Sequence, residues 1–183
     1  MRITAIPTTT TDAKVVPLYA AVKGALGLVP NLMQVLGNSP AALQGYLSLN
    51  GALGTGVLPA AVRERLALLV AEANGCDYCL AAHTLLGKHA GLDAAESQRA
   101  RLGTSQDAFA NAALALGRAV VQARGKISDA DIAEARKAGF DQAAIVEVVA
   151  HVALNVLTNY INNLAQTTID FPAAPALTAS AAK

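Results

Sequence analysis

The sequence predicts an all-α fold of about eight helices, and three observations lead to this class. Alanine and leucine are abundant, aromatic residues make up only 4% of the chain and tryptophan is absent, which favours helices over a β-sandwich. No alternating apolar and polar pattern of useful strand length occurs. Glycine, proline and capping residues divide the chain into segments of helical length. Its 183 residues are expected to form one domain with short appendages.

Proline and glycine divide the first part of the chain. Residues 1–12 are predicted to form an irregular arm, followed by a helix over 13–26 that a glycine ends. Pro17 is expected near the first turn of that helix. A proline then opens a short helix. The Ser39-Pro40 pair that follows is typical of an N-cap and the first residue of the next helix.

The central part of the chain is predicted to contain two helices in succession. The first runs from Pro59 to Asn74, where an Asn-Gly pair ends it. The second is expected to begin around Cys76 or Asp77 and to end near Gly91. A core stripe is expected along the first of these helices, formed by Val62, Leu66, Leu69 and Ala73.

Capping residues mark the helices of the last part of the chain. Asp93 and Glu96 have the spacing of a capping box, and a long helix is expected over 105–124. Ser128 and Asp141 are expected to cap the last two helices, the second being the longest. These boundaries predict a helical domain over 13–172, followed by a disordered Ala/Pro/Ser-rich tail over 173–183.

Charge and hydropathy exclude several classes of partner. Fourteen basic and thirteen acidic residues leave a formal net charge of +1, and no basic run indicates nucleic-acid binding. The N-terminus lacks the apolar segment of a signal peptide, so we expect a cytoplasmic protein. The segment 142–169 has a single charged residue, Glu147, but a histidine and several asparagines interrupt it. We therefore expect a helix buried in a core or a subunit interface, and no membrane span.

Both cysteines of the chain lie in the stretch CDYCLAAH, as Cys76 and Cys79, with His83 four residues further on. On one helix, Cys79 lies about 60° and His83 about 20° from Cys76, so the three residues share a face. A helix N-terminus and a nearby imidazole both lower a thiol pKa. A thiolate that meets a hydroperoxide becomes a sulfenic acid, which a second thiol converts to a disulfide. Position at the helix start favours Cys76 as the attacking thiol, whereas adjacency to the histidine slightly favours Cys79.

Two other interpretations of the cysteine pair remain open at this point. Zinc requires four ligands, and beside Cys76, Cys79 and His83 the chain offers at best His89 or His151. A pair of buried cysteines without chemistry is the second alternative. The histidine on the same helical face argues against a chance pair, and one Cys-x-x-Cys without a second ligand pair is weak evidence for zinc. No cofactor is predicted.

The residues around this motif carry a resemblance to a known family. The stretch LPAAVRERLALLVAEANGCDYCLAAHT resembles the core motif of AhpD-like alkylhydroperoxidases in the carboxymuconolactone decarboxylase superfamily. The family pattern is a glutamate, then Cys-x-x-Cys twelve residues later, then a histidine, which here are Glu64, Cys76, Cys79 and His83. Flanking stretches resemble the peroxidase-related branch, so the likeness covers roughly residues 25–172.

The resemblance implies an all-helical, homotrimeric or homohexameric thiol peroxidase that an external dithiol reduces. It assigns the attack to Cys79 and the resolving step to Cys76, with Glu64 and His83 as a proton relay. Glu72 is a nearer competitor for the carboxylate role. The alternatives are a thiol–disulfide oxidoreductase acting on another substrate, a decarboxylase, or a metal-binding module.

Three further features lead to expectations about the site. The best-studied AhpD type has a histidine where this chain has Tyr78, which points about 200° away from Cys76 and is expected to pack. Glu64 is expected to be partly buried, with a raised pKa, because apolar residues share its face. His89 is expected to be exposed in a last helical turn. A polar strip on the last helix is expected to form a structural seam in preference to a pocket wall, and consists of His151, Asn155, Asn159 and Asn162.

Overall fold

The computed structural model describes residues 1–177, and within this range it contains nine α-helices and no strand. The all-α class is therefore confirmed, with a helix count close to the expected one. The helices are α1 (Val16–Leu26), α2 (Asn31–Leu36), α3 (Pro40–Gly54), α4 (Ala60–Ala73), α5 (Asp77–His89), α6 (Ala94–Arg101), α7 (Ala108–Ala123), α8 (Asp129–Lys137) and α9 (Gln142–Ala165).

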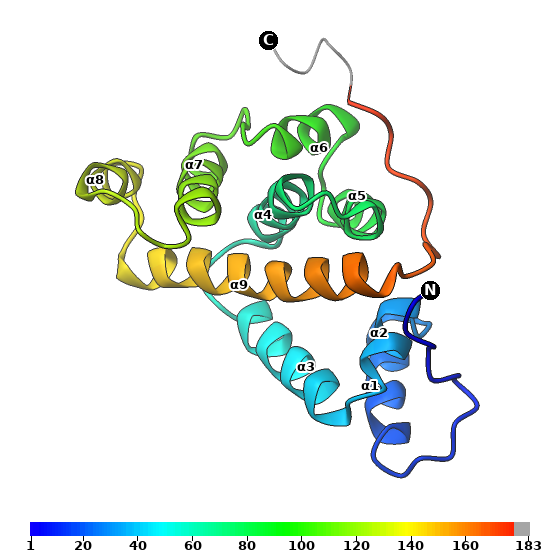
Figure 1. Cartoon of the computed structure of the whole chain (residues 1–183). Helices are drawn as coiled ribbons and strands as arrows, with labels where there is room; N and C mark the ends of the chain where they lie inside the picture. The colour runs from blue at the N-terminus through cyan, green and yellow to red at the C-terminus, as the bar shows by residue number, and fades with distance from the viewer. Residues whose placement is uncertain (178–183) are drawn as a thin grey trace.

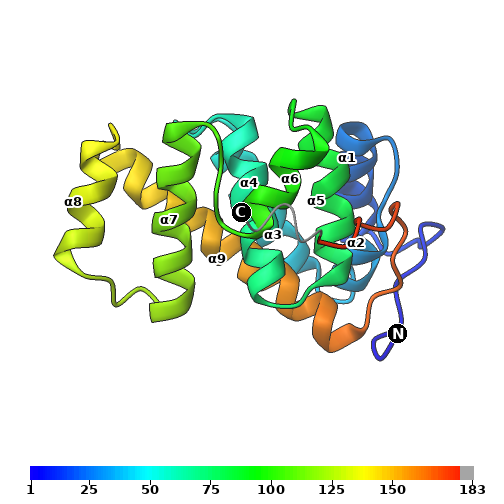
Figure 2. The ribbon, with the colours of Figure 1, turned by 90° about the horizontal axis from the view of Figure 1, so that it is seen from above.

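The long helix α9 crosses the molecule between two groups of helices (Figure 1). Helices α4 to α8 lie on one side of it and α1 to α3 on the other, and α9 contacts α2, α3, α4, α5 and α7. Seen from above, α8 lies at one end of the assembly, and α1 and α2 lie at the other (Figure 2). By length and composition α9 could cross a membrane. Its place between two layers, with buried polar residues such as Asn159 on it, is that of a core helix.

Helix α4 is buried more completely than the sequence predicted. Val62, Leu66 and Leu69 of the expected stripe are buried, but Ala73, the last residue of the helix, is exposed. Leu68 and Val70, which lie outside the stripe, are fully buried as well. The predicted stripe is thus confirmed except at Ala73, and burial extends beyond it because α4 contacts α5, α6, α7 and α9, which surround it on most sides.

Two helices begin later than predicted, and local hydrogen bonds explain both differences. Helix α1 begins at Val16 because the Asp12 carbonyl accepts hydrogen bonds from Val15 and Val16 in a preceding turn. This start places Pro17 in the first turn, where no intrahelical N–H is needed. Helix α7 begins at Ala108 because Asp107 caps it by accepting from the amide of Ala110.

The predicted capping box at the start of α6 forms only in part. Asp93 accepts from the amide of Glu96 at 2.7 Å, as expected. The Glu96 carboxylate turns instead to Arg65 of α4, to the Ser105 hydroxyl and to the amide of Gln106. Burial alone would raise the pKa of Glu96, but these donors lower it to about 2. Glu96 therefore joins three segments of the fold and does not close its own helix.

The other predicted caps form as expected. Ser128 and Asp131 make a complete capping box at the start of α8. Asp141 accepts from the amide of Ala144 and caps α9, which with 24 residues is the longest helix described.

The chain beyond α9 runs back along α2 and α5. Asp170 accepts from the amide of Asn31 at 2.8 Å, and the Phe171 ring meets Tyr78 edge-on at 5.6 Å between centroids. The Pro175 carbonyl accepts from Arg101 at 2.6 Å. Residues 178–183 of the predicted tail lie outside the described residues.

Candidate active site

The two cysteines occupy the turn between α4 and α5 and the first turn of α5. Gly75 makes this turn with a φ of 59°, a left-handed conformation that glycine adopts without strain. Cys76 is the N-cap residue of α5, and its sulfur accepts from the amide of Cys79 at 3.3 Å. Both side chains are free thiols and buried. The arrangement leaves Cys79 one turn inside the helix, under a positive N-terminal dipole.

The surroundings of Cys79 favour its thiolate. A hydrogen bond from Cys76 lowers the pKa of Cys79, burial opposes this, and the charge of His83 and the amide of Asn162 lower it further, to about 6. Asn162, on α9, donates from Nδ2 to the sulfur at 3.3 Å. The same thiol hydrogen bond, followed by burial, raises the pKa of Cys76. The pair is thus unequal, with one thiol ionised near neutral pH and the other protonated.

Glu64 and His83 meet across the α4–α5 contact, with Oε2 and Nδ1 2.8 Å apart. Their side chains are 21% and 22% exposed, so the pair lies at the edge of the core. Burial lowers the pKa of His83, but the charge and hydrogen bond of Glu64 outweigh it and raise the pKa overall. With Nδ1 donating to the carboxylate, a neutral His83 presents Nε2 as an acceptor. The structure thus brings together the four residues that the sequence motif singled out.

Tyr78, Glu72 and His89 lie outside this group. The Tyr78 hydroxyl accepts from the amide of Leu32 at 3.1 Å, and burial raises the pKa of the phenol. Glu72 forms an ion pair with Arg101 at 2.6 Å. His89 is exposed at the end of α5. As expected, Tyr78 packs, and Glu64 rather than Glu72 meets the histidine.

The polar strip of α9 divides into two parts. Asn162 contacts the thiol, and Asn159 accepts from Asn74 at 2.9 Å, which is the expected seam between helices. His151 and Asn155 line a pocket. The structural prediction therefore holds for Asn159 and Asn162, which join α9 to neighbouring segments, whereas His151 and Asn155 line a pocket wall instead.

That pocket has a volume of about 490 Å³ and opens beside Glu64 and His83. Most of its wall is apolar and comes from α1, α3 and α9. Tyr46 of α3 also lines it, and burial, together with the charges of Glu64 and Cys79, raises the pKa of this phenol to about 12. Sequence reasoning missed Tyr46 and the contact of Asn162 with the thiol. Both lie on helices distant in sequence from the motif, so no spacing could reveal them.

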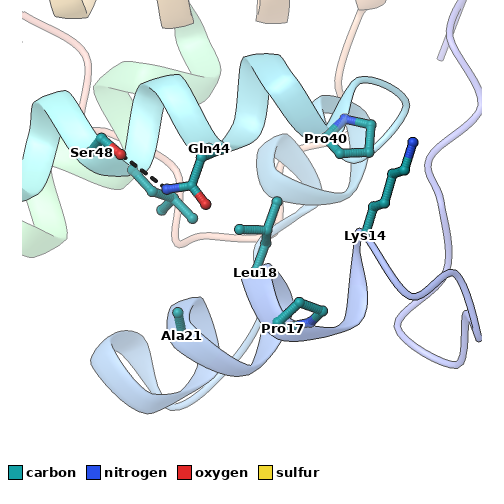
Figure 3. Close-up of a pocket in the computed structure, with 8 residues that line it drawn as sticks. Lys14, Pro17, Leu18, Ala21, Pro40, Gln44 and Ser48 are labelled. Atoms are coloured by element: carbon teal, nitrogen blue, oxygen red, sulfur yellow. Dashed lines mark hydrogen bonds between the residues drawn. The ribbon is translucent and has the colours of Figure 1, made fainter.

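A second hollow lies between α1 and α3 and is shown in Figure 3. It is an open groove of about 620 Å³ whose wall includes Lys14, Leu18 and Gln44, the last donating to Ser48 at 2.9 Å. None of the residues from the cysteine motif lines it. Over residues 1–177, the His, Cys, Asp and Glu side chains form no group of three or more that could hold a metal ion.

Comparisons with known proteins concern the fold and the segment that contains these residues. Residues 40–123 match the model of the carboxymuconolactone decarboxylase family. This stretch is therefore similar to a domain of that family. It covers α3 to α7 and includes Glu64, both cysteines and His83. Comparison with curated proteins gives no match.

Solved structures share the fold over nearly the whole chain. The AhpD core of an uncharacterized peroxidase-related protein from Ralstonia eutropha JMP134 superposes with a TM-score of 0.83 at 21% identity, over 92% of each chain. A peroxidase-related protein from Silicibacter sp. TM1040 gives 0.74 at 20% identity, over 89% of this chain and 88% of that one. The debrominase Bmp8, in complex with 2,3,4-tribromopyrrole, gives 0.76 at 18% identity, over 91% and 90%. The fold and the family domain together confirm the resemblance to AhpD-like proteins.

Proposed function

We propose that this protein is a thiol-dependent peroxidase that reduces organic hydroperoxides through a Cys79–Cys76 disulfide cycle. The observation that carries the proposal is the unequal thiol pair. Cys79, with a pKa lowered to about 6, lies on α5 together with His83, which the carboxylate of Glu64 holds in place. A thiolate beside a protonated histidine is suited to attack a peroxide at neutral pH.

The first step forms an S–O bond and breaks the O–O bond of the peroxide. The Cys79 thiolate attacks the terminal oxygen, and the leaving alkoxide takes the proton of His83 to become an alcohol. Cys79 is then a sulfenic acid. Glu64 keeps the pKa of His83 raised, so the imidazole carries this proton at the start of the cycle.

The second step forms the disulfide and releases water. Cys76 retains its proton until this point because the bond to Cys79 and burial raise its pKa. Its sulfur attacks the sulfenic sulfur, and the departing hydroxide takes the proton. An external dithiol then reduces the disulfide by exchange. We place the protein in the cytoplasm, where such reductants keep thiols reduced.

The direct test is peroxide consumption by single cysteine variants with cumene hydroperoxide and dithiothreitol. Cys79→Ser is expected to abolish consumption. Without dithiothreitol, Cys76→Ser is expected to react once and to remain as a sulfenic acid that dimedone traps. Both variants keep a buried polar group of similar size. Full turnover by Cys79→Ser would refute the proposal.

Reductive dehalogenation is a second candidate, favoured by the largely apolar pocket that Glu64 and His83 line and by the debrominase of the same fold. In that reaction the Cys79 thiolate and the Cys76 thiol together supply two electrons and one proton, the carbon–halogen bond becomes a carbon–hydrogen bond, and a disulfide and a halide ion form. Incubation with 2,3,4-tribromopyrrole distinguishes the candidates, because bromide release without peroxide consumption favours dehalogenation. Decarboxylation does not require a thiol pair, so activity in a double cysteine variant would favour it.

We also propose that the protein is a homo-oligomer, a trimer or a hexamer. The face of α9 turned away from the core exposes large apolar side chains along its whole length, and exposed apolar patches of this kind mark interfaces. They are Val146, Val149, Leu157, Tyr160 and Leu164.

A further inference from the structure

The pocket beside Glu64 and His83 has two distinct ends. Along α3, its wall runs from Tyr46 to Gly54, eight residues or about 12 Å. The charges of Glu64 and Cys79 act on Tyr46, so this residue marks the thiol end. Gly54, at the end of α3, marks the other.

The wall residues on helix α9 identify the same two ends of the pocket. Its wall residues run from Thr158 to His151, seven residues or about 10 Å. Thr158 lies one helical turn from Asn162, which contacts the Cys79 sulfur at 3.3 Å. His151 therefore lies at the end remote from the thiols, where the charge of Arg63 acts on it and the charges of Glu147 and Glu64 act in the opposite sense.

The remote end carries a cation without an acidic partner. Arg63 donates from Nη1 to the carbonyls of Leu53 and Gly54, at 3.1 and 2.6 Å. Within the described residues it forms no ion pair with an acidic side chain. Glu147, the nearby carboxylate of α9, accepts instead from the amides of Val57 and Leu58. A guanidinium has five donors, so most of those of Arg63 remain for a ligand.

A second polar group lies at the same end. His151 is 5% exposed and lines the pocket, and its Nε2 is buried without a hydrogen-bond partner in the described structure. A buried nitrogen without a partner destabilises the folded protein, and a ligand oxygen that reaches it would offset this cost. The rest of the wall is mainly apolar and includes Leu26, Met33, Leu86 and Leu154.

We infer that this pocket binds an organic carboxylate with an extended apolar chain, its carboxylate on Arg63 and His151 and its chain directed towards His83. If the protein is a thiol peroxidase as proposed, this ligand class makes its substrate a hydroperoxy carboxylic acid. The peroxide group then lies at the thiol end, one pocket length from the carboxylate.

Binding of octanoate, measured by isothermal titration calorimetry, tests the inference without any redox chemistry. Octanol is the matched ligand without charge. The wild-type protein is expected to bind octanoate at least tenfold more tightly than octanol. Arg63→Gln is expected to abolish this preference and to bind octanol as before, which shows that the pocket is intact.

Two more variants complete the test. Lys126→Gln removes an exposed cation between α7 and α8 and is expected to leave both affinities unchanged. His151→Leu leaves the contacts of Arg63 with α3 in place and is expected to weaken octanoate severalfold. Equal binding of octanoate and octanol, or octanoate binding that neither Arg63→Gln nor His151→Leu weakens, would overturn the inference.

The test of the ligand class can be distinguished from the test of the peroxidase proposal. Arg63-dependent octanoate binding in a protein that consumes no peroxide supports the ligand class and refutes the peroxidase. Equal consumption of a hydroperoxy fatty acid and its methyl ester, unchanged in Arg63→Gln, supports the peroxidase and refutes the ligand class.

Discussion

The amide of Asn162 is the contact that ties the reactivity of Cys79 to a distant helix. It donates to the sulfur at 3.3 Å and helps to lower the pKa of Cys79 to about 6. Asn162→Leu removes the donor at similar volume and is expected to raise this pKa by about one unit. The thiolate fraction at pH 7 then falls. The check is the pH dependence of Cys79 alkylation by iodoacetamide, followed by peptide mass spectrometry.

The control for this prediction is the neighbouring residue. Asn163 is exposed and donates to the Asn74 carbonyl at 2.8 Å, away from the sulfur. Asn163→Leu is expected to leave the alkylation midpoint unchanged. Equal midpoints for wild type and Asn162→Leu would count against a role of the amide.

The carboxylate of Glu64 sets the protonation of His83. Because Glu64 raises the pKa of His83, Glu64→Gln is expected to lower it. A smaller fraction of His83 is then protonated at pH 7, so the alkaline limb of the pH profile of kcat moves to lower pH. Because less of the general acid is available, peroxide consumption is expected to fall about 100-fold. Glu72→Gln, which removes the carboxylate paired with Arg101, is the control and is expected to keep the wild-type profile. The same profile in both variants would contradict a proton relay.

The part of the site that could be predicted is the part that lies within one local stretch of sequence. The spacing of Glu64, Cys76, Cys79 and His83 reflects two consecutive helices, so one stretch of sequence contains all four residues. Asn162 reaches the thiol only through the tertiary packing of α9. The sequence signal for Asn162 was a polar residue on an otherwise apolar helix. Such a signal indicates that a polar group is buried, but it does not identify the group that it contacts.

Among the helices, the contact of α7 with α4 depends on a glycine. A Cβ at Gly117 would lie 2.7 Å from Leu66 Cδ2 and 3.4 Å from Leu69 Cδ2, both in the buried core. Gly117→Ala gains about 1 kcal/mol of helix propensity but overpacks the core by about 1–3 kcal/mol. The variant is expected to be less stable by about 1 kcal/mol in urea unfolding.

Gly45 provides the matched control on α3. A Cβ there meets nothing within 4 Å, so Gly45→Ala is expected to be more stable by about 0.5–1 kcal/mol. A stabilising effect of both substitutions would refute the close approach of α7 and α4.

Helix boundaries, like the site residues, could be predicted from the sequence only where the interaction that sets them is local. Caps made within one turn, such as that of Ser128, were predicted correctly because donor and acceptor are three residues apart. The capping box at Asp93 formed only in part because Arg65 and Ser105 compete for the Glu96 carboxylate. The burial of α4 on most sides depends on four neighbours, which its own periodicity cannot report.

For the whole molecule, the exposed face of α9 predicts self-association. Leu164 and Tyr160 are 61% and 60% exposed, and a charge placed there is expected to disfavour burial against a second copy. Leu164→Asp is expected to shift the sedimentation coefficient from that of a trimer or hexamer to that of a monomer. Val57→Asp, at an equally apolar exposed position on the α3–α4 loop, is the control and is expected to keep the wild-type assembly. A monomeric wild-type protein would contradict the proposed oligomer.

The central claim is that Cys79 and Cys76 form a disulfide in response to an organic hydroperoxide. The most direct measurement is mass spectrometry of the intact and digested protein during titration with cumene hydroperoxide. The account predicts one Cys76–Cys79 disulfide for each equivalent of peroxide, with sulfenic acid only on Cys79 as the precursor. A dithiol that stays reduced, or an oxidised Cys76 beside an unmodified Cys79, would contradict it.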